Sequence, residues 1–134
     1  MAQPHPRVID PQHPLVERVR AICMHLPEAV EIESRGRPQW RAGKGTIFAY
    51  VAVSMNRPFT VGFDADEGER PALLDDARFF VPPYSGAHGW LAADLDAADT
   101  DWQLLSELIE TSYRRSANKR QLAALDSRPP QTLV

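Results

Sequence analysis

The chain has 134 residues, a length that fits a single domain with one hydrophobic core. Charged residues make up 25% and apolar residues 43%, which excludes an intrinsically disordered protein, and a net charge of −3 gives no overall attraction to polyanions. Cys23 is the only cysteine, and no apolar run approaches the roughly 20 residues of a membrane helix. These features predict a cytoplasmic protein with no disulfide and no membrane association.

The predicted organisation has three parts. Residues 1–9 form a flexible lead-in, residues 10–125 form the single domain, and residues 126–134 form a flexible tail. The sequence has twelve prolines, and those in the middle of the chain lie between apolar runs. Because proline lacks an N–H group and fixes φ, these positions mark the boundaries of short elements.

The first predicted element is an amphipathic helix that begins at Asp10-Pro11, with the aspartate as N-cap and the proline in the first turn. Pro27 ends it, since the residue before a proline avoids the helical region. Apolar residues recur between these points at spacings of three or four, as one helix face requires: Leu15, Val19, Ile22 and Leu26.

A series of strands is predicted next. Val30 and Ile32 alternate with glutamates, a pattern typical of a half-buried strand. The sequence Gly43-Lys44-Gly45 predicts a tight hairpin. Residues 46–53 (TIFAYVAV) have no polar face, which predicts a central strand that is at least partly covered on both sides. In this strand alternate residues share a side: Ile47, Ala49, Val51 and Val53 on one, and Phe48, Tyr50 and Ala52 on the other.

The second half of the chain completes the sheet. Phe59, Val61 and Phe63 give the next strand an apolar face, and a short helix is predicted around Leu73 and Leu74. Residues 79–81 and 90–95 are the last predicted strands, and a capping box formed by Thr100 and Gln103 begins a final helix that includes residues 102–113. The predicted fold is α+β, with a single antiparallel sheet of about five or six strands and with the N- and C-terminal helices packed on one side.

Three sequence features occur together in this order. The leading helix ends in Leu26-Pro27 and is followed by acidic residues, the stretch from Gly36 to Lys44 runs into TIFAYVAV, and Pro83-Tyr84 precedes Gly89-Trp90 and the last helix. Over residues 12–120 the chain thereby resembles the MmcQ/YjbR family. The resemblance implies a compact α+β domain similar to the double-wing DNA-binding motif, with no catalytic residues and no cofactor.

A basic hairpin is the strongest functional signal. Residues 35–45 contain four cations and no acid: Arg35, Arg37, Arg41 and Lys44. Arg37 and Arg41 are four residues apart, which is twice the two-residue period of a strand. They therefore share a face opposite Trp40. We predict weak, salt-sensitive contacts with DNA phosphates, assisted by three more cations: Arg57, Arg115 and Lys119. The alternative is a solvated sheet face whose edge is guarded by charge.

A second basic cluster lies near the end of the last predicted helix, at residues 114–120. If that helix continues, Arg115 and Lys119 share a face. The alternative is that these cations only complement the helix dipole.

Catalytic and metal-binding motifs are weak in this sequence. His88, in the loop near Tyr84 and Ser85, is the only candidate for a general base, and no His, Cys or Asp spacing fits a metal site. We therefore predict a protein that is not an enzyme and has neither metal nor cofactor. The alternative to DNA binding is an interaction domain for a protein or small ligand, which uses an apolar sheet face around Phe48 and Tyr50, with a homodimer through that face as one form.

Overall fold

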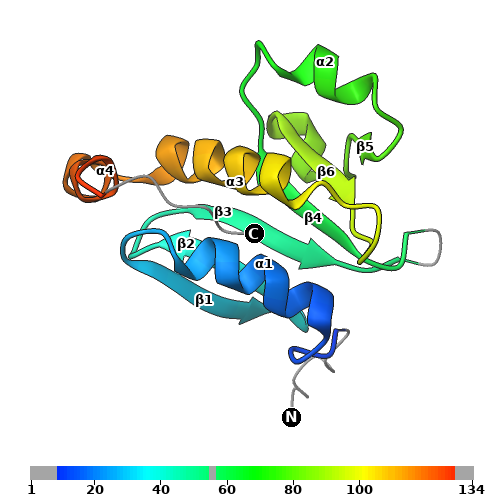
Figure 1. Ribbon diagram of the computed structural model, residues 1–134, viewed down its shortest axis with the longest axis horizontal. Coiled ribbons are helices and arrows are strands. Elements are labelled where there is room, and N and C mark those ends of the chain that lie inside the picture. Colours follow the sequence, from blue (N-terminus) through cyan, green and yellow to red (C-terminus); the bar gives the residue numbers. More distant parts are fainter. Residues whose placement is uncertain (1–8, 55–56, 129–134) are drawn as a thin grey trace.

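A computed structural model of the chain describes residues 9–54 and 57–128 (Figure 1). Within these ranges one antiparallel sheet has the strand order β1-β2-β3-β4-β6-β5. Its strands are β1 (Ala29–Ser34), β2 (Arg37–Ala42), β3 (Ile47–Ala52), β4 (Thr60–Asp64), β5 (Phe79–Phe80) and β6 (Trp90–Asp94). The helices are α1 (Pro14–Met24), α2 (Arg70–Leu74), η1 (Ser85–His88, a 3₁₀ helix), α3 (Trp102–Ser116) and α4 (Lys119–Asp126). The predicted α+β fold is confirmed.

Helices α1 and α3 lie side by side across one face of the sheet (Figure 1). The buried side of α1 consists of Val16, Val19, Ile22 and Cys23, and α3 contributes Leu105, Leu108, Ile109 and Tyr113. Ile9, which precedes α1, also lies in this core and is 3% exposed. We call this side of the sheet the covered face.

Helix α1 begins three residues later than predicted. His13 is the N-cap, and its Nδ1 accepts a hydrogen bond from the N–H of Leu15 at 3.1 Å. Asp10 instead forms a separate turn, in which its carboxylate accepts from the N–H of Gln12 at 2.9 Å. The sequence offers two prolines that could occupy the first helical position, Pro11 and Pro14, and the helix begins at the second.

Strand β1 has the predicted alternation but the opposite orientation. Glu31 is paired with Trp40 across the β1–β2 ladder, and its carboxylate accepts a hydrogen bond from the Trp40 indole N–H at 3.0 Å. Arg20 of α1 donates to the same carboxylate at 2.6 Å. The glutamates therefore face α1, while Val30 and Ile32 point to the other side, and Val30 is 39% exposed. An edge strand at the border of the helix layer can hold a glutamate there because Arg20 reaches it.

The predicted assignment of the β3 side chains to the two faces is wrong at Phe48 because of a β-bulge. The register between β2 and β3 shifts at Trp40/Arg41, so that Trp40 pairs with Ala49 and Arg41 pairs with Ile47. Phe48 is consequently turned to the covered face, where it is fully buried and meets the Tyr113 ring edge-on at 5.3 Å. The extra residue of a bulge breaks the period of two, which no alternation count in one strand reveals.

Two hairpin turns orient the first three strands. Arg35 and Gly36 connect β1 and β2 with φ of 55° and 77°, the two positive φ values of a type I′ turn. Gly43, with φ of 58°, begins the connection to β3 and confirms the predicted Gly43–Gly45 hairpin.

The C-terminal helices differ from the prediction at two points. Asp101 is the N-cap of α3 and accepts from the N–H of Leu104 at 3.0 Å, so the predicted Thr100–Gln103 capping box is wrong. Helix α3 ends at Ser116, and a capping box between Asn118 and Gln121 begins α4. No helix within residues 9–54 and 57–128 is long and apolar enough to cross a membrane.

Candidate ligand surface on the open face of the sheet

The face of the sheet opposite α1 and α3, here called the open face, carries a groove of about 740 Å³. Its floor includes Tyr50 and Ala52 of β3, and the segment 82–85 forms one wall. Arg35 and Arg37 line it on the side of the β1–β2 turn. This volume lies within the roughly 300–1,000 Å³ typical of pockets for small organic ligands.

Tyr50 is the fixed centre of the open face. Its ring lies on Gly62 of β4, where an added Cβ would stand only 2.2 Å from ring carbons, so only glycine leaves this space. The ring stacks with Trp90 at 5.6 Å between centroids, and the hydroxyl is 3.0 Å from the Ser85 hydroxyl. Strands β4 and β6 and the 82–85 wall thus hold one rigid aromatic group in place.

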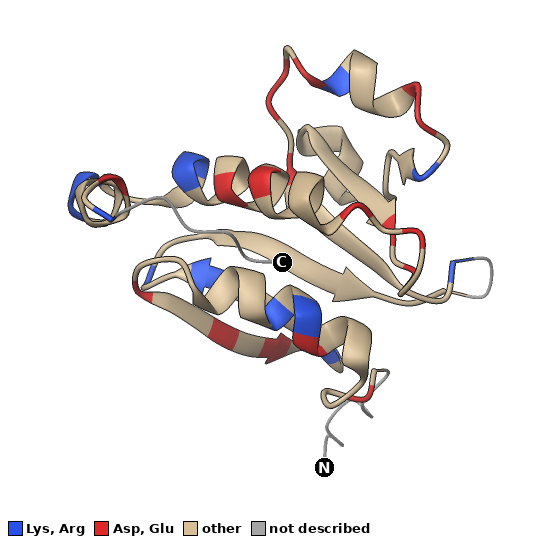
Figure 2. Ribbon diagram, viewed as in Figure 1, with Lys and Arg blue, Asp and Glu red and all other residues tan. Residues whose placement is uncertain are grey.

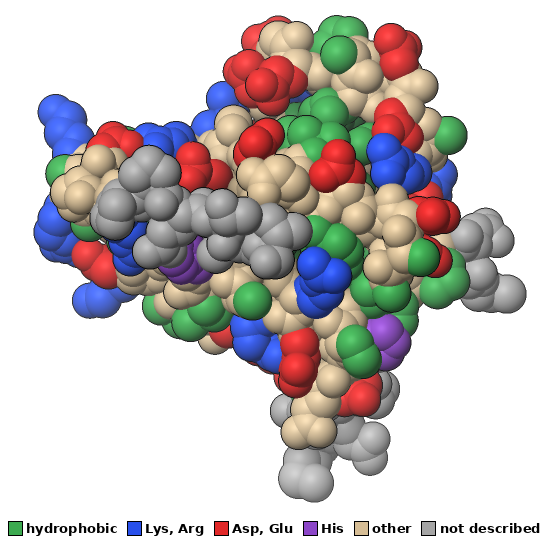
Figure 3. Space-filling view, in the orientation of Figure 1, with side chains coloured by type: hydrophobic (Ala, Val, Ile, Leu, Met, Phe, Trp, Pro, Cys, Tyr) green, Lys and Arg blue, Asp and Glu red, His purple; other side chains and the backbone are tan. Residues whose placement is uncertain are grey.

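The arginines of the described residues fall into two groups. Six have a carboxylate within 2.8 Å: Arg20 with Glu31, Arg57 with Asp94, Arg78 with Asp76, Arg114 with Asp126, Arg115 with Asp64, and Arg120 with Glu28. The hydrogen bonds from Arg78 hold the pKa of Asp76 at about 2. Figure 2 shows acidic and basic residues interspersed along the ribbon, and Figure 3 shows their side chains interspersed on the helix-bearing side. Six of the twelve arginines in the described ranges are therefore already paired with a carboxylate.

The arginines of the basic hairpin belong to the second group. Arg18, Arg70 and Arg128 belong to it too, but these three contact an aromatic ring or a backbone carbonyl. Within the described ranges, no carboxylate pairs with Arg35, Arg37, Arg41 or Lys44. The Nε atoms of Arg37 and Arg41 are buried and have no hydrogen-bond partner among these residues. Both residues are only half-buried, and a cation without an internal carboxylate can donate to an external anion.

The predicted phosphate-binding residues do not all converge. Arg37 and Arg41 lie on the open face, as their pairing with Ser34 and Val30 requires, and Arg35 stands at the turn beside them. Arg57 also lines the groove, yet it is held by Asp94 at 2.6 Å and lies over the Phe80 ring at 3.7 Å.

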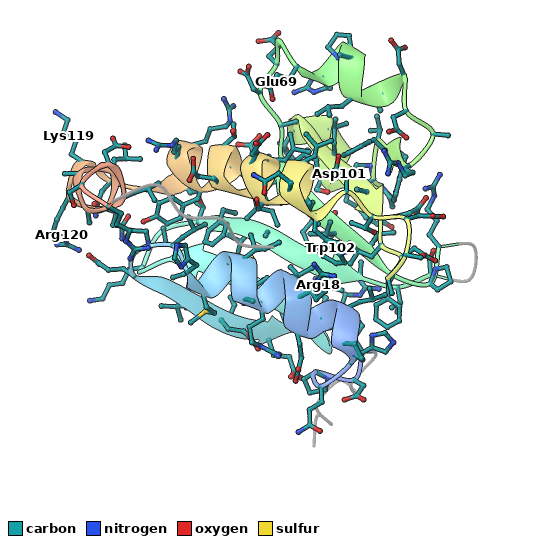
Figure 4. All side chains as sticks on the ribbon, in the orientation of Figure 1. Arg18, Glu69, Asp101, Trp102, Lys119 and Arg120 are labelled. Carbon is teal, nitrogen blue, oxygen red and sulfur yellow. The ribbon has the colours of Figure 1, made fainter. Side chains whose placement is uncertain are left out.

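The other three predicted residues lie elsewhere. Lys44 lies beyond the far end of β2, beside Glu28 and Arg120 in a separate depression. Arg115 is bound to Asp64 at 2.8 Å. Lys119 begins α4, so the shared helix face expected for Arg115 and Lys119 does not exist. Figure 4 shows Lys119 and Arg120 at the α4 end of the molecule, away from Arg18, whose guanidinium lies 4.2 Å over the Trp102 ring.

Tyr84 is the candidate that sequence reasoning missed. It is 94% exposed, lines the groove and has φ of 65° and ψ of −68°. The sequence signal that could have indicated Tyr84 is the Pro82-Pro83 pair immediately before it. Two prolines fix the backbone φ angles that lead to the next residue.

His88 and Cys23 are the two reactive side chains that the sequence analysis singles out within the described residues. His88 is exposed, and in the described part of the chain its side chain has no hydrogen bond or ion pair. Burial raises the pKa of the Cys23 thiol well above its usual value. No group of three potential metal ligands occurs in the described ranges.

Comparison with known proteins places this antiparallel α+β domain in a family. The YjbR family model matches residues 24–115, which is more than half of the chain. The chain therefore belongs to the YjbR family, as the sequence resemblance indicated. The crystal structure of the Deinococcus radiodurans protein DR2400, which has a DUF419 domain, is similar with a TM-score of 0.62 and 20% identity, over 86% of this chain and 91% of that chain. At this identity the likeness shows a common fold. No curated protein matches the chain.

Proposed function

We propose that this protein is a non-enzymatic nucleic-acid-binding module whose open sheet face contacts phosphates. The observation that carries the proposal is the separation of the charges. Six arginines are bound by carboxylates, while those on the open face of the first hairpins, Arg35, Arg37 and Arg41, are not. A cation left without an internal partner is available for an external anion.

We assign the phosphate contacts to the three open-face arginines that have no carboxylate partner in the described ranges. Three open-face arginines give a salt dependence of binding to duplex DNA with a logarithmic slope near −2.7, from about −0.9 for each phosphate contact. Lys44 would add a phosphate contact only if the ligand extends past the far end of β2. Arg57 and Arg115 contribute less because each must first leave its carboxylate. Affinities of about 10⁻⁴ to 10⁻⁶ M are expected, as for non-specific complexes.

Fluorescence anisotropy with a labelled duplex at several low salt concentrations tests this proposal. Arg37→Gln/Arg41→Gln should weaken binding at least tenfold. It should also reduce the magnitude of the logarithmic salt slope by the amount expected for about two phosphate contacts. Arg114→Gln/Arg120→Gln is the matched control, because it removes the same formal charge from arginines that already have carboxylate partners.

Equal losses in the two double variants would show that only overall charge matters, and would contradict a specific basic face. An absence of binding at the lowest salt would remove the proposal altogether. Thermal unfolding of each variant confirms that the fold is retained.

A second candidate is a domain that binds a small anionic molecule. The volume of the groove and its mixture of aromatic floor and guanidinium groups favour it. Isothermal titration with nucleoside monophosphates distinguishes the two, because a small-ligand domain would bind them more tightly than it binds any oligonucleotide.

A further inference from the structure

We propose that the groove of the open face receives an unpaired nucleotide, so that the protein prefers single-stranded to duplex nucleic acid. The base stacks on Tyr84, and the adjoining phosphate meets Arg35 and Arg37. The inference rests on the proposed nucleic-acid binding and adds to it the form of the nucleic acid that is bound.

The exposure of Tyr84 is the first observation. Its side chain is 94% exposed, whereas Tyr50 is half-buried and Tyr113 is fully buried. No hydrogen bond or ring contact of the Tyr84 side chain occurs within the described residues. An aromatic ring in water gains nothing for the stability of the fold, because the hydrophobic effect rewards only buried surface. The ring is therefore available as a stacking surface.

The backbone of Tyr84 is the second observation. A φ of 65° with a ψ of −68° is a rare and strained conformation for a residue with a side chain. The surrounding turn maintains it: the N–H of Ser85 donates to the Pro83 carbonyl at 2.8 Å and that of Gly86 to the Pro82 carbonyl at 3.0 Å. The loop thus projects the ring into solvent at the border of the groove and limits the freedom of its backbone.

The charges around the groove are the third observation. Arg35 and Arg37 line the groove that Tyr84 also lines, and neither has a carboxylate partner in the described ranges. The buried, unbonded Nε of Arg37 lacks an acceptor. Arg57 is occupied by Asp94 and by the face of Phe80. The lining therefore keeps two uncompensated cations, which match the phosphate of a nucleotide rather than a neutral ligand.

The combination of one free ring and two free cations selects a single strand. In a duplex both faces of an internal base are covered by its neighbours in the stack, so that an aromatic side chain reaches only an unpaired base. Single-strand binding proteins combine the same two elements, a basic groove and aromatic rings on which bases stack. A duplex would contact the arginines but not the ring.

The test is fluorescence anisotropy of the full chain with a labelled oligothymidine of about 12 nucleotides and with a duplex of the same length. Tyr84→Ala should weaken single-strand binding roughly 5- to 150-fold, as the loss of one base–aromatic stack predicts, and should leave duplex binding within about twofold. Tyr84→Phe should retain single-strand binding, because stacking does not need the hydroxyl. Met24→Ala, which truncates another exposed apolar side chain on α1, is the matched control and should have no effect.

The outcomes separate this inference from the function on which it rests. If both nucleic acids bind in a salt-sensitive way and Tyr84→Ala weakens neither, the single-strand inference is wrong and the phosphate-binding function stands. If neither binds, both are wrong. If poly-glutamate displaces the oligothymidine as well as unlabelled oligothymidine does, the groove binds anionic chains of any kind, and the inference is also overturned.

Discussion

The two faces of the sheet are made of alternate residues of the same strands, yet they meet different physical demands. On β2, Trp40 is fully buried against the helices, while its neighbours Gln39 and Arg41 are half-buried on the open face. The covered face is filled by buried apolar side chains from α1, α3 and the strands. The open face contains an anchored tyrosine, a groove and unpaired arginines.

This difference suggests a division between stability and recognition. Substitutions on the covered face should reduce the free energy of unfolding, because they leave cavities or unpaired polar groups in a close-packed layer. Substitutions on the open face should change ligand binding with little effect on stability. The following predictions test this division, from the largest expected effect to the smallest.

Trp40→Ala should reduce the free energy of unfolding by about 3–5 kcal/mol, because it removes a fully buried indole and its hydrogen bond to Glu31. Gln39→Ala, one residue earlier on the opposite side of the same strand, should change it by about 0.5 kcal/mol or less. Urea denaturation followed by tryptophan fluorescence and circular dichroism measures both. Similar losses for the two variants would contradict the division.

Gly62→Ala should cost about 1–3 kcal/mol, because the new Cβ would stand 2.2 Å from the Tyr50 ring and would force it off Trp90 and Ser85. This is the one large effect expected on the open face. The cost should mostly disappear in a Tyr50→Ala background, which a double-mutant cycle measures. Gly68→Ala is the matched control, since its Cβ would meet only the Asp66 carboxylate at an ordinary 3.6 Å.

Tyr113→Phe should cost about 1 kcal/mol, because it removes the donor to the Pro27 carbonyl at 2.7 Å. Burial raises the pKa of Tyr113 above 10.0, so the phenol stays protonated in the native state at a pH where the unfolded chain ionises. Stability from this group is therefore complete below pH 10 and is lost as the pH rises through the native pKa. Ultraviolet titration should show a late-ionising phenol that is missing in Tyr113→Phe.

Arg37→Met and Arg41→Met should change the free energy of unfolding by about 0.5 kcal/mol or less, or stabilise slightly, because each replaces a buried, unbonded Nε by an apolar group. Arg57→Met should cost more, up to about 1 kcal/mol, since it leaves Asp94 without its partner. Thermal unfolding of the three variants measures whether the loss of stability is larger for Arg57→Met than for Arg37→Met and Arg41→Met. A large loss for Arg37→Met would mean that this arginine serves the fold rather than a ligand.

Much of the fold could be predicted from the sequence, because strand alternation and the helical stripe of α1 are local properties. The turn at Gly43 and the short helix at Leu73 and Leu74 were predicted from local signals too. The errors come from choices that depend on the rest of the molecule. Glu31 faces α1, where Arg20 from eleven positions earlier and the Trp40 indole both bind it. Phe48 changes sides because of a bulge in the pairing with the neighbouring strand.

The candidate site was predictable in part. The period of two correctly placed Arg37 and Arg41 on one face. Ion pairing could not be predicted, since Arg115 meets Asp64 from 51 positions away and Arg57 meets Asp94 from 37. The groove itself is formed by β3, the β1–β2 turn and the 82–85 wall, which approach one another only in the folded chain.

The unequal borders of the sheet have a consequence for self-association. Strand β5 is two residues long, so that border offers hardly any free backbone for the addition of a foreign strand. Strand β1, at the other border, is six residues long but carries glutamates at alternate positions. Fibril growth by strand addition is thereby disfavoured at both borders, and we expect the arginine- and tyrosine-bearing surface to stay exposed without polymerisation through the sheet edges.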